Sequence, residues 1–208
     1  MSKFIALRVL YLLDERSEKL AYRLANEAEK FGKCQFKLDV DHLPHITIYH
    51  AEYPVKNLSK IRSSLKNYSN KLHGSKLWSQ GLESGWGYVG VNFKKTKDIL
   101  KIHEDLVKEL NLLREGHVRE KYHEEIEKGI YSQSEAINIR EFGYPYVLDL
   151  YRPHMNLVKF ENESLGIKAM NKLIKEFRNF EGRIQGLALA EKGEFGSVSK
   201  LLDKCIFR

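Results

Sequence analysis

The sequence predicts an α+β fold, organised as one domain over residues 1–208 with two related halves. Strand-like and helix-like segments alternate along the chain, but hairpins also occur, and this mixture is typical of α+β proteins. One short motif occurs twice, each time leading into a strand and preceding a helix. No shift in composition marks a linker, and 42% hydrophobic residues are enough to build a substantial core.

Each expected element follows from the spacing of its apolar residues. The expected strands are 3–13, 45–49, two short strands within 76–93, 148–160 with an interruption at Pro153, 183–191 and 197–207. The expected helices are 15–31, 57–72, 96–114, 119–128 and 164–180. Ser17 and Asn57 are the expected helix N-caps, and Gly32 is expected to end the first helix.

Two stretches fit this scheme less well. Residues 115–147 are highly charged, become aromatic towards their end, and are interpreted as an insertion or lid, with a protein-docking element as the alternative. Trp86 lies between Gly85 and Gly87 in the expected hairpin. We interpret Trp86 as an aromatic that anchors the hairpin, with a ligand platform as the alternative.

Composition narrows the class of partner. The formal net charge is +7, from 35 Lys and Arg against 28 Asp and Glu, which favours phosphate-bearing ligands or, alternatively, reflects only a basic surface. No apolar run approaches the ~20 residues of a membrane span. Cys34 and Cys205 are too few for a disulfide framework. We therefore expect a cytoplasmic, reduced protein that is monomeric and does not bind membranes.

The repeated motif consists of Pro-His followed by apolar, polar and apolar residues. It reads LPHITI at 43–48 and RPHMNL at 152–157. Because side chains alternate between the two faces of a strand, each histidine shares a face with the polar residue two positions later. These pairs are His45 with Thr47, and His154 with Asn156. Each strand thus has an apolar back for the core and a polar front for a cleft.

Two imidazoles in one cleft suit the chemistry of a phosphodiester. A neutral histidine removes a proton from water or a ribose hydroxyl, and a protonated histidine donates one to the leaving oxygen. Thr47 and Asn156 can donate hydrogen bonds to the phosphate, but the sequence does not assign which histidine is the base. No metal and no cofactor are expected, and His42 and His50 are expected at strand ends in solvent rather than as metal ligands.

These residues resemble the paired HxTx motifs of the 2H phosphoesterase superfamily, which includes 2′-5′ RNA ligase-like proteins and cyclic nucleotide phosphodiesterases. The similarity extends over most of the chain, from the opening strand to the closing strands at 184–189 and 200–202. It implies a bilobal fold of two pseudo-symmetric antiparallel-sheet lobes with outer helices and a central cleft. It also implies hydrolysis of 2′,3′-cyclic phosphates or related cyclic phosphoesters, with ligation of RNA ends by some members. Because the sequence has no cluster of metal ligands, we expect a metal-independent phosphoesterase that acts on 2′,3′-cyclic phosphates or 2′-5′-linked nucleotide or RNA ends.

The chain departs from the family pattern in two places. Asn156 replaces the Thr or Ser of the second motif, and the span between the motifs is long because of residues 115–147. A catalytically weakened RNA- or nucleotide-binding module of the same fold is therefore the alternative to an enzyme. The further candidates for substrate contact are Tyr49, Tyr151, Arg152 and Lys159. A regular strand would put Lys159 on the face opposite His154, so its role requires a bend in the strand.

Overall fold

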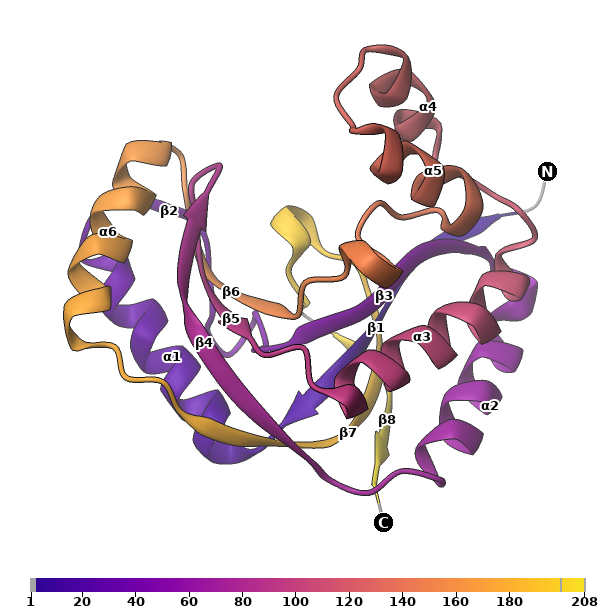
Figure 1. Ribbon diagram of the computed structural model, residues 1–208, viewed down its shortest axis with the longest axis horizontal. Coiled ribbons are helices and arrows are strands. Elements are labelled where there is room, and N and C mark those ends of the chain that lie inside the picture. The colour runs from indigo at the N-terminus through magenta and orange to yellow at the C-terminus, as the bar shows by residue number, and fades with distance from the viewer. Residues whose placement is uncertain (1–2, 199, 208) are drawn as a thin grey trace.

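An antiparallel sheet of eight strands forms two lobes in the computed structural model, which describes residues 3–198 and 200–207 (Figure 1). The strand order is β2-β6-β5-β4-β7-β1-β3, and β8 pairs with β7. The strands are β1 Phe4–Leu13, β2 Cys34–Lys37, β3 Ile46–Pro54, β4 Ser75–Gly85, β5 Tyr88–Phe93, β6 His154–Phe160, β7 Glu181–Glu191 and β8 Leu201–Ile206. β4 belongs to both lobes, because it pairs first with β7 and then with β5.

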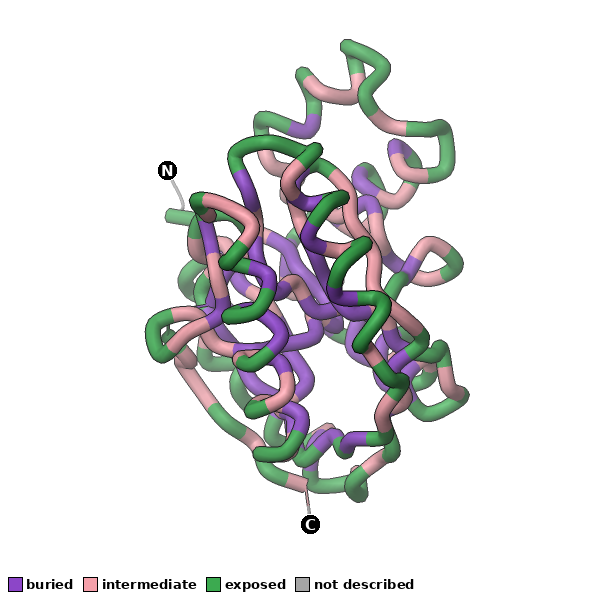
Figure 2. The backbone as a smooth tube through the Cα atoms, turned by 90° about the vertical axis from the view of Figure 1, so that its left-hand side faces the viewer, coloured by how far each residue is buried: buried purple, intermediate pink, exposed green. Residues whose placement is uncertain are grey.

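Helices cover the outer face of each lobe. The α-helices of the described residues are α1 Glu15–Glu29, α2 Leu58–Ser69, α3 Lys97–Asn111, α4 Glu120–Glu127, α5 Gln133–Phe142 and α6 Glu163–Glu176. α1 and α6 pack on the lobe that contains β5 and β6, whereas α2 and α3 pack on the lobe that contains β3, β7 and β8 (Figure 1). The chain is buried where these helices meet the sheet, and its exposed segments lie on the outer turns (Figure 2). The predicted bilobal α+β class is confirmed.

Both motif strands carry a β-bulge at the same point. In β3, Leu10 of β1 pairs with Thr47 and Val9 pairs with Tyr49, so Ile48 is the extra residue. In β6, the register with β5 jumps from Asn156 to Val158 in the same way. A bulge reverses the facing of every residue beyond it. The two halves therefore repeat a backbone irregularity as well as a sequence motif.

Several expected caps and element boundaries differ in the structure. Asp14, rather than Ser17, caps α1: its carboxylate accepts a hydrogen bond from the Ser17 amide at 2.8 Å. Asn57 makes no capping bond to α2 and instead donates to the Leu113 carbonyl at 2.8 Å. The short strand β2 and helix α5 were not predicted, and β6 and β8 are shorter than expected. Ser199, in the expected last strand, lies outside the described residues.

A buried arginine holds residues 115–147 against the rest of the fold. α4 and α5 rise above the lobe of α2 and α3 (Figure 1). Arg114, only 2% exposed, donates to the carbonyls of His117 and Glu141 and to the Asn111 side chain. Its side chain packs on Gly143, whose positive φ of 71° ends α5. Among all the residues that the structure describes, no helix is long and apolar enough to cross a membrane.

Replacing Arg114 with alanine is expected to lower the free energy of unfolding by about 3 kcal/mol or more, because a buried side chain is removed and two carbonyls and the Asn111 amide oxygen lose their donor. Urea denaturation measures this change. The exposed Arg16 provides a matched control, and Arg16→Ala should change stability by less than about 0.5 kcal/mol. An Arg114→Ala protein as stable as Arg16→Ala would contradict this account of how the segment is held.

Candidate active site

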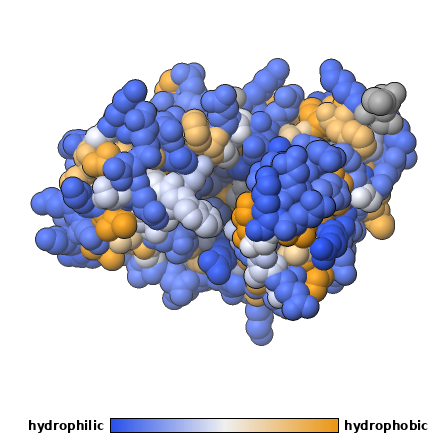
Figure 3. All heavy atoms as spheres, turned by 90° about the horizontal axis from the view of Figure 1, so that it is seen from above, coloured by the Kyte–Doolittle hydropathy of each residue, from blue (hydrophilic) through white to orange (hydrophobic). Residues whose placement is uncertain are grey.

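The two motifs meet in a cleft between the lobes. A cavity of about 600 Å³ lies there, and the space-filling view shows the surface hollowed between the lobes, with many hydrophilic residues around it (Figure 3). The four motif side chains line this cavity: His45, Thr47, His154 and Asn156. The structure therefore brings together residues that are far apart in the sequence. Their roles in catalysis stay a prediction.

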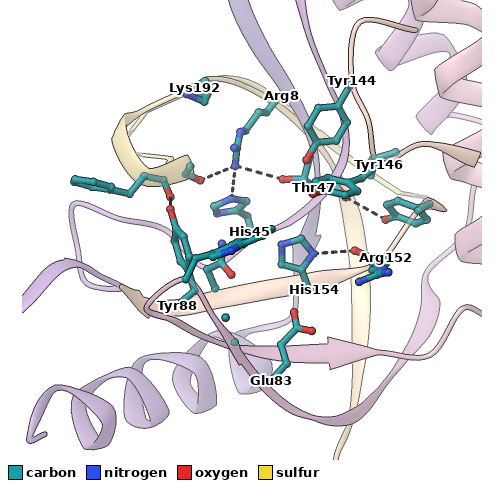
Figure 4. A pocket seen from close by; sticks show the side chains of 18 of the residues that line it. Arg8, His45, Thr47, Glu83, Tyr88, Tyr144, Tyr146, Arg152, His154 and Lys192 are labelled. Carbon is teal, nitrogen blue, oxygen red and sulfur yellow. Dashed lines mark hydrogen bonds between the residues drawn. The ribbon is translucent and has the colours of Figure 1, made fainter. Parts of the chain in front are cut away.

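The same hydrogen bond fixes both imidazoles. His45 Nδ1 lies 2.8 Å from the Leu43 carbonyl. His154 Nδ1 lies 2.8 Å from the Arg152 carbonyl (Figure 4). Because a carbonyl oxygen can only accept, Nδ1 must carry the hydrogen in each ring. The intervening proline fixes its own φ and has no N–H, which keeps the preceding carbonyl beside the ring. In each neutral histidine, Nε2 is therefore left with its lone pair.

Arg8 is the principal residue that the sequence analysis missed. From the middle of β1, its Nη1 donates to the Gly196 carbonyl at 2.5 Å, to His45 Nε2 at 3.3 Å and to Thr47 Oγ1 at 3.5 Å (Figure 4). No carboxylate within the described residues forms an ion pair with it. The available signal was a single charged residue inside an otherwise apolar strand. A cation that is partly removed from water and has no counter-ion is suited to contact an anion.

The environment of His45 keeps its ring neutral. Burial lowers the pKa of His45 to about 3, and the neighbouring Arg8 guanidinium acts in the same direction. Burial also lowers the pKa of Arg8. His45 therefore presents an unprotonated Nε2 at neutral pH, as a general base requires.

The wall of the cavity beside His154 carries a negative charge, whereas the wall beside His45 carries the positive charge of Arg8. His154 pairs across the sheet with Asn92, whose side chain holds the Glu83 carboxylate at 2.8 Å. Glu83 lines the cavity, so a carboxylate occupies this side and Arg8 occupies the other (Figure 4). Asn156 pairs with Gly90, where any Cβ would come within 2.9 Å of the Met155 carbonyl. Glycine at this position leaves the floor of the cleft open.

Tyr151 and His103 connect the two motifs. Tyr151 lines the cavity, but its hydroxyl donates to the Thr47 carbonyl at 3.1 Å and its ring stacks on His103 at 3.7 Å. His103 Nδ1 donates to the carbonyl of Ile48 at 2.7 Å, and its Nε2 accepts from the Leu148 amide at 2.9 Å. Thr47 and its bulge are thus tied to the segment that leads into His154.

The bulges change the expected facing of two candidate residues. Tyr49 was a candidate for the cleft face, with packing inside the fold as the alternative, and it is buried on the other face, where its hydroxyl donates to the Phe142 carbonyl at 2.5 Å. The interpretation of Tyr49 as a cleft residue is therefore wrong. Lys159 turns to the front face because Leu157 is the extra residue, yet it does not line the cavity. Its ammonium lies 5.4 Å from the Tyr88 ring and donates to Gln35 at 2.6 Å.

Two further histidine expectations can be compared with the structure. His50 is 2% exposed rather than in solvent, and its Nδ1 donates to the Leu7 carbonyl at 3.0 Å. His42 is partly exposed and contacts Asp39 at 2.9 Å. In the described part of the chain, no group of three or more His, Cys, Asp or Glu residues is placed to hold a metal ion.

Other parts of the chain complete the walls of the cavity. Arg152 lines it, and its contact with a substrate stays a prediction. Tyr144 and Tyr146 come from the end of the 115–147 segment, and Lys192 comes from the turn after β7 (Figure 4). These three residues carry no local motif, and only the folded chain places them beside the histidines.

Comparison with solved structures defines the class of fold. TT0787 of Thermus thermophilus has 15% identity and a TM-score of 0.62, with 98% of each chain covered. Escherichia coli LigT complexed with phosphate has 10% identity, a TM-score of 0.53 and 99% coverage of both chains. LigT complexed with 3′-AMP has 8% identity with the same coverage and TM-score. The chain therefore has the 2H phosphoesterase fold, as its paired motifs predicted.

The sequence itself places the chain in a family without an assigned function. A family model described as "Protein of unknown function (DUF1045)" matches residues 56–197, so the chain belongs to this family. The matched range contains the second motif but not the first, which is at 43–48. No curated protein matches the sequence.

The buried histidines predict how stability depends on pH. The pKa of His45 is lowered to about 3 and that of His103 to about 4, both chiefly by burial, and burial also lowers the pKa of His50. Unfolded histidine binds a proton near pH ~6.5. Below that pH the unfolded state binds more protons than the folded state. The buried histidines therefore contribute fully to stability above pH ~6.5, and this contribution is lost as the pH falls towards their pKa values in the folded protein.

Between pH ~7.5 and ~5, the free energy of unfolding should fall by about 2 kcal/mol for each buried neutral histidine. Urea denaturation across this range measures the slope. His103→Gln should make the slope shallower, whereas substitution of the exposed His123 by Gln should leave it unchanged. Equal slopes in His103→Gln and wild type would show that His103 is not held neutral by the fold.

Proposed function

We propose that this protein is a metal-independent phosphoesterase that hydrolyses 2′,3′-cyclic phosphates or 2′-5′-linked nucleotide or RNA ends. One observation carries the proposal: two imidazoles with fixed Nδ1–H tautomers line a single cleft, next to an arginine that has no carboxylate partner among the described residues. Hydrolysis of a phosphodiester requires three functions: activation of the nucleophile, protonation of the leaving group and neutralisation of the phosphate charge.

His45 is assigned as the general base for hydrolysis. Its neutral Nε2 takes a proton from water as the water oxygen attacks phosphorus. An anionic phosphate beside Arg8 offsets the positive charge that lowers the His45 pKa, so binding of the substrate favours proton uptake at Nε2. His45 ends this step as an imidazolium.

His154 is assigned as the general acid. Its protonated Nε2 donates to the ribose oxygen as the bond from that oxygen to phosphorus breaks, which opens the ring and leaves a phosphomonoester. Exchange of protons with water then restores both histidines. In ligation a 5′-hydroxyl replaces the attacking water, and the two histidines keep these roles. In the reverse reaction, in which the neighbouring ribose hydroxyl attacks a 2′-5′ linkage and re-forms the cyclic phosphate, the roles are exchanged, as microscopic reversibility requires.

Arg8, Thr47 and Asn156 are assigned to the phosphate itself. Arg8 Nη1 already reaches both His45 Nε2 and Thr47 Oγ1, so a phosphate oxygen bound there lies next to the base. The Asn156 amide provides a donor from the opposite strand, although it replaces a hydroxyl. Tyr144 and Tyr146 make residues 115–147 an insertion that closes one side of the cleft.

The comparisons support the kind of ligand. LigT, which shares the fold over 99% of both chains, has been crystallised with phosphate and with 3′-AMP. A cavity of about 600 Å³ has the size of a site for a mononucleotide-sized ligand. The positive net charge of the chain also favours an anionic ligand such as a nucleotide.

Purified protein should open 2′,3′-cyclic nucleotides in the presence of EDTA. His45→Ala and His154→Ala should each lose about 10²–10⁴ in rate, because each removes an acid/base group. The exposed His123→Ala is the matched control and should retain full activity. Nucleotide binding without turnover in the wild type would instead favour the binding module with a weakened second motif. A strict requirement for a divalent cation would contradict the mechanism.

Arg8→Met should lower kcat/KM by about 10²–10³, through the loss of a positive charge at the phosphate. It should also move the acid limb of the pH–rate profile to higher pH, because Arg8 contributes to the low pKa of His45. The profile separates this role from a structural one. A lower rate with an unshifted acid limb would show that Arg8 does not act on His45.

A further inference from the structure

Trp86 is exposed at the rim of the cavity, in a backbone conformation that disfavours it. Its side chain is 77% exposed and lines the cavity, so the interpretation of Trp86 as a hairpin anchor is wrong. Trp86 and Gly87 form the two-residue turn between β4 and β5, and both have positive φ, 51° and 82°. Such turns favour Asn, Asp or Gly, so a tryptophan there carries conformational strain.

The hairpin is held without help from the indole. The Phe160 amide donates to the Gly87 carbonyl at 2.8 Å, and the Trp86 amide donates to the Glu163 carboxylate at 3.0 Å. Gly166 of α6 packs closely on the turn, since a Cβ there would lie 3.2 Å from the Gly87 carbonyl. These contacts fix the backbone of the turn and leave the indole ring free.

A second aromatic residue at the rim has the same unusual backbone. Phe195 has a φ of 49°, is 37% exposed and lines the cavity. Its carbonyl accepts from the Tyr88 hydroxyl at 3.1 Å, which ties its loop to the strand that follows the Trp86 turn (Figure 4). Lys159 Nζ lies 5.1 Å from the Phe195 ring and adds a positive charge.

We propose that Trp86 and Phe195 form a stacking subsite for the nucleobase of the substrate. A strained, exposed indole that does not hold its own turn is suited to a ligand with a planar ring, and every nucleobase offers such a face. This inference rests on the proposed function and narrows it: the substrate is a nucleoside phosphate or an RNA end, rather than the cyclic phosphate of a bare sugar or of glycerol.

Tryptophan fluorescence tests the subsite independently of catalysis. Trp78 and Trp86 are the two tryptophans of the chain, so Trp78→Phe leaves Trp86 as the only reporter. Titration with 3′-AMP should quench its emission, whereas ribose 5-phosphate and inorganic phosphate should not. Equal responses to 3′-AMP and ribose 5-phosphate would overturn the proposal, because then the ring makes no contact with the indole.

Substitution of Trp86 distinguishes stacking from a structural role. Trp86→Asn should weaken 3′-AMP binding about 10-fold, within the range for loss of one base–aromatic stack. It should leave the melting temperature unchanged or raise it, because asparagine suits the turn. Leu112→Ala, which removes another exposed apolar side chain (78% exposed), is the matched control and should alter neither quantity. A less stable Trp86→Asn protein with unchanged binding would overturn the proposal.

Activity separates failure of this inference from failure of the proposed function. If 2′,3′-cyclic AMP and glycerol 1,2-cyclic phosphate are hydrolysed with equal kcat/KM, the phosphoesterase assignment stands and the stacking subsite does not. If 3′-AMP quenches Trp86 but no cyclic phosphate is hydrolysed, the subsite stands and the enzymatic assignment fails.

Discussion

The chemistry of the cleft depends on one hydrogen bond made twice, from Nδ1 of a histidine to the carbonyl two residues earlier. The proline between these residues keeps the carbonyl in place, and the carbonyl determines the tautomer. Without this bond, either nitrogen could carry the proton and either could face the substrate. With this bond, both rings present Nε2 to the substrate. This explains chemically why a proline precedes each histidine.

The two halves share a backbone, but the charges around their histidines differ. Each motif strand has a β-bulge directly after its polar residue, at Ile48 in β3 and at Leu157 in β6. The two motif strands therefore share the same irregular register with their neighbouring strands. Arg8 then lies beside His45, whereas Glu83 lies on the wall near His154. In our account this difference in charge gives two similar histidines opposite tasks.

The sequence was sufficient to predict the class of fold and to predict that the four motif residues share one cleft, because strand periodicity and a repeated motif are local signals. The sequence was misleading where side chains stop alternating between the two faces of a strand, because a β-bulge cannot be recognised from a pattern with period two. Tyr49 was placed on the wrong face for this reason. Arg8, Tyr144 and Lys192 reach the cleft through pairing between distant strands and loops. The sequence signalled only Arg8, as a single charge within an apolar strand, whereas Tyr144 and Lys192 can be identified only in the folded chain.

The central claim, that His45 is a neutral base whose Nε2 faces the phosphate, is tested most directly by nitrogen-15 NMR of the histidine rings. The account predicts an Nδ1–H tautomer for His45 that stays neutral to a pKa of about 3 in the free protein. It also predicts that added inorganic phosphate shifts the Nε2 resonance of His45. A His45 ring that titrates near pH ~6.5, or that carries its proton on Nε2, would contradict the account.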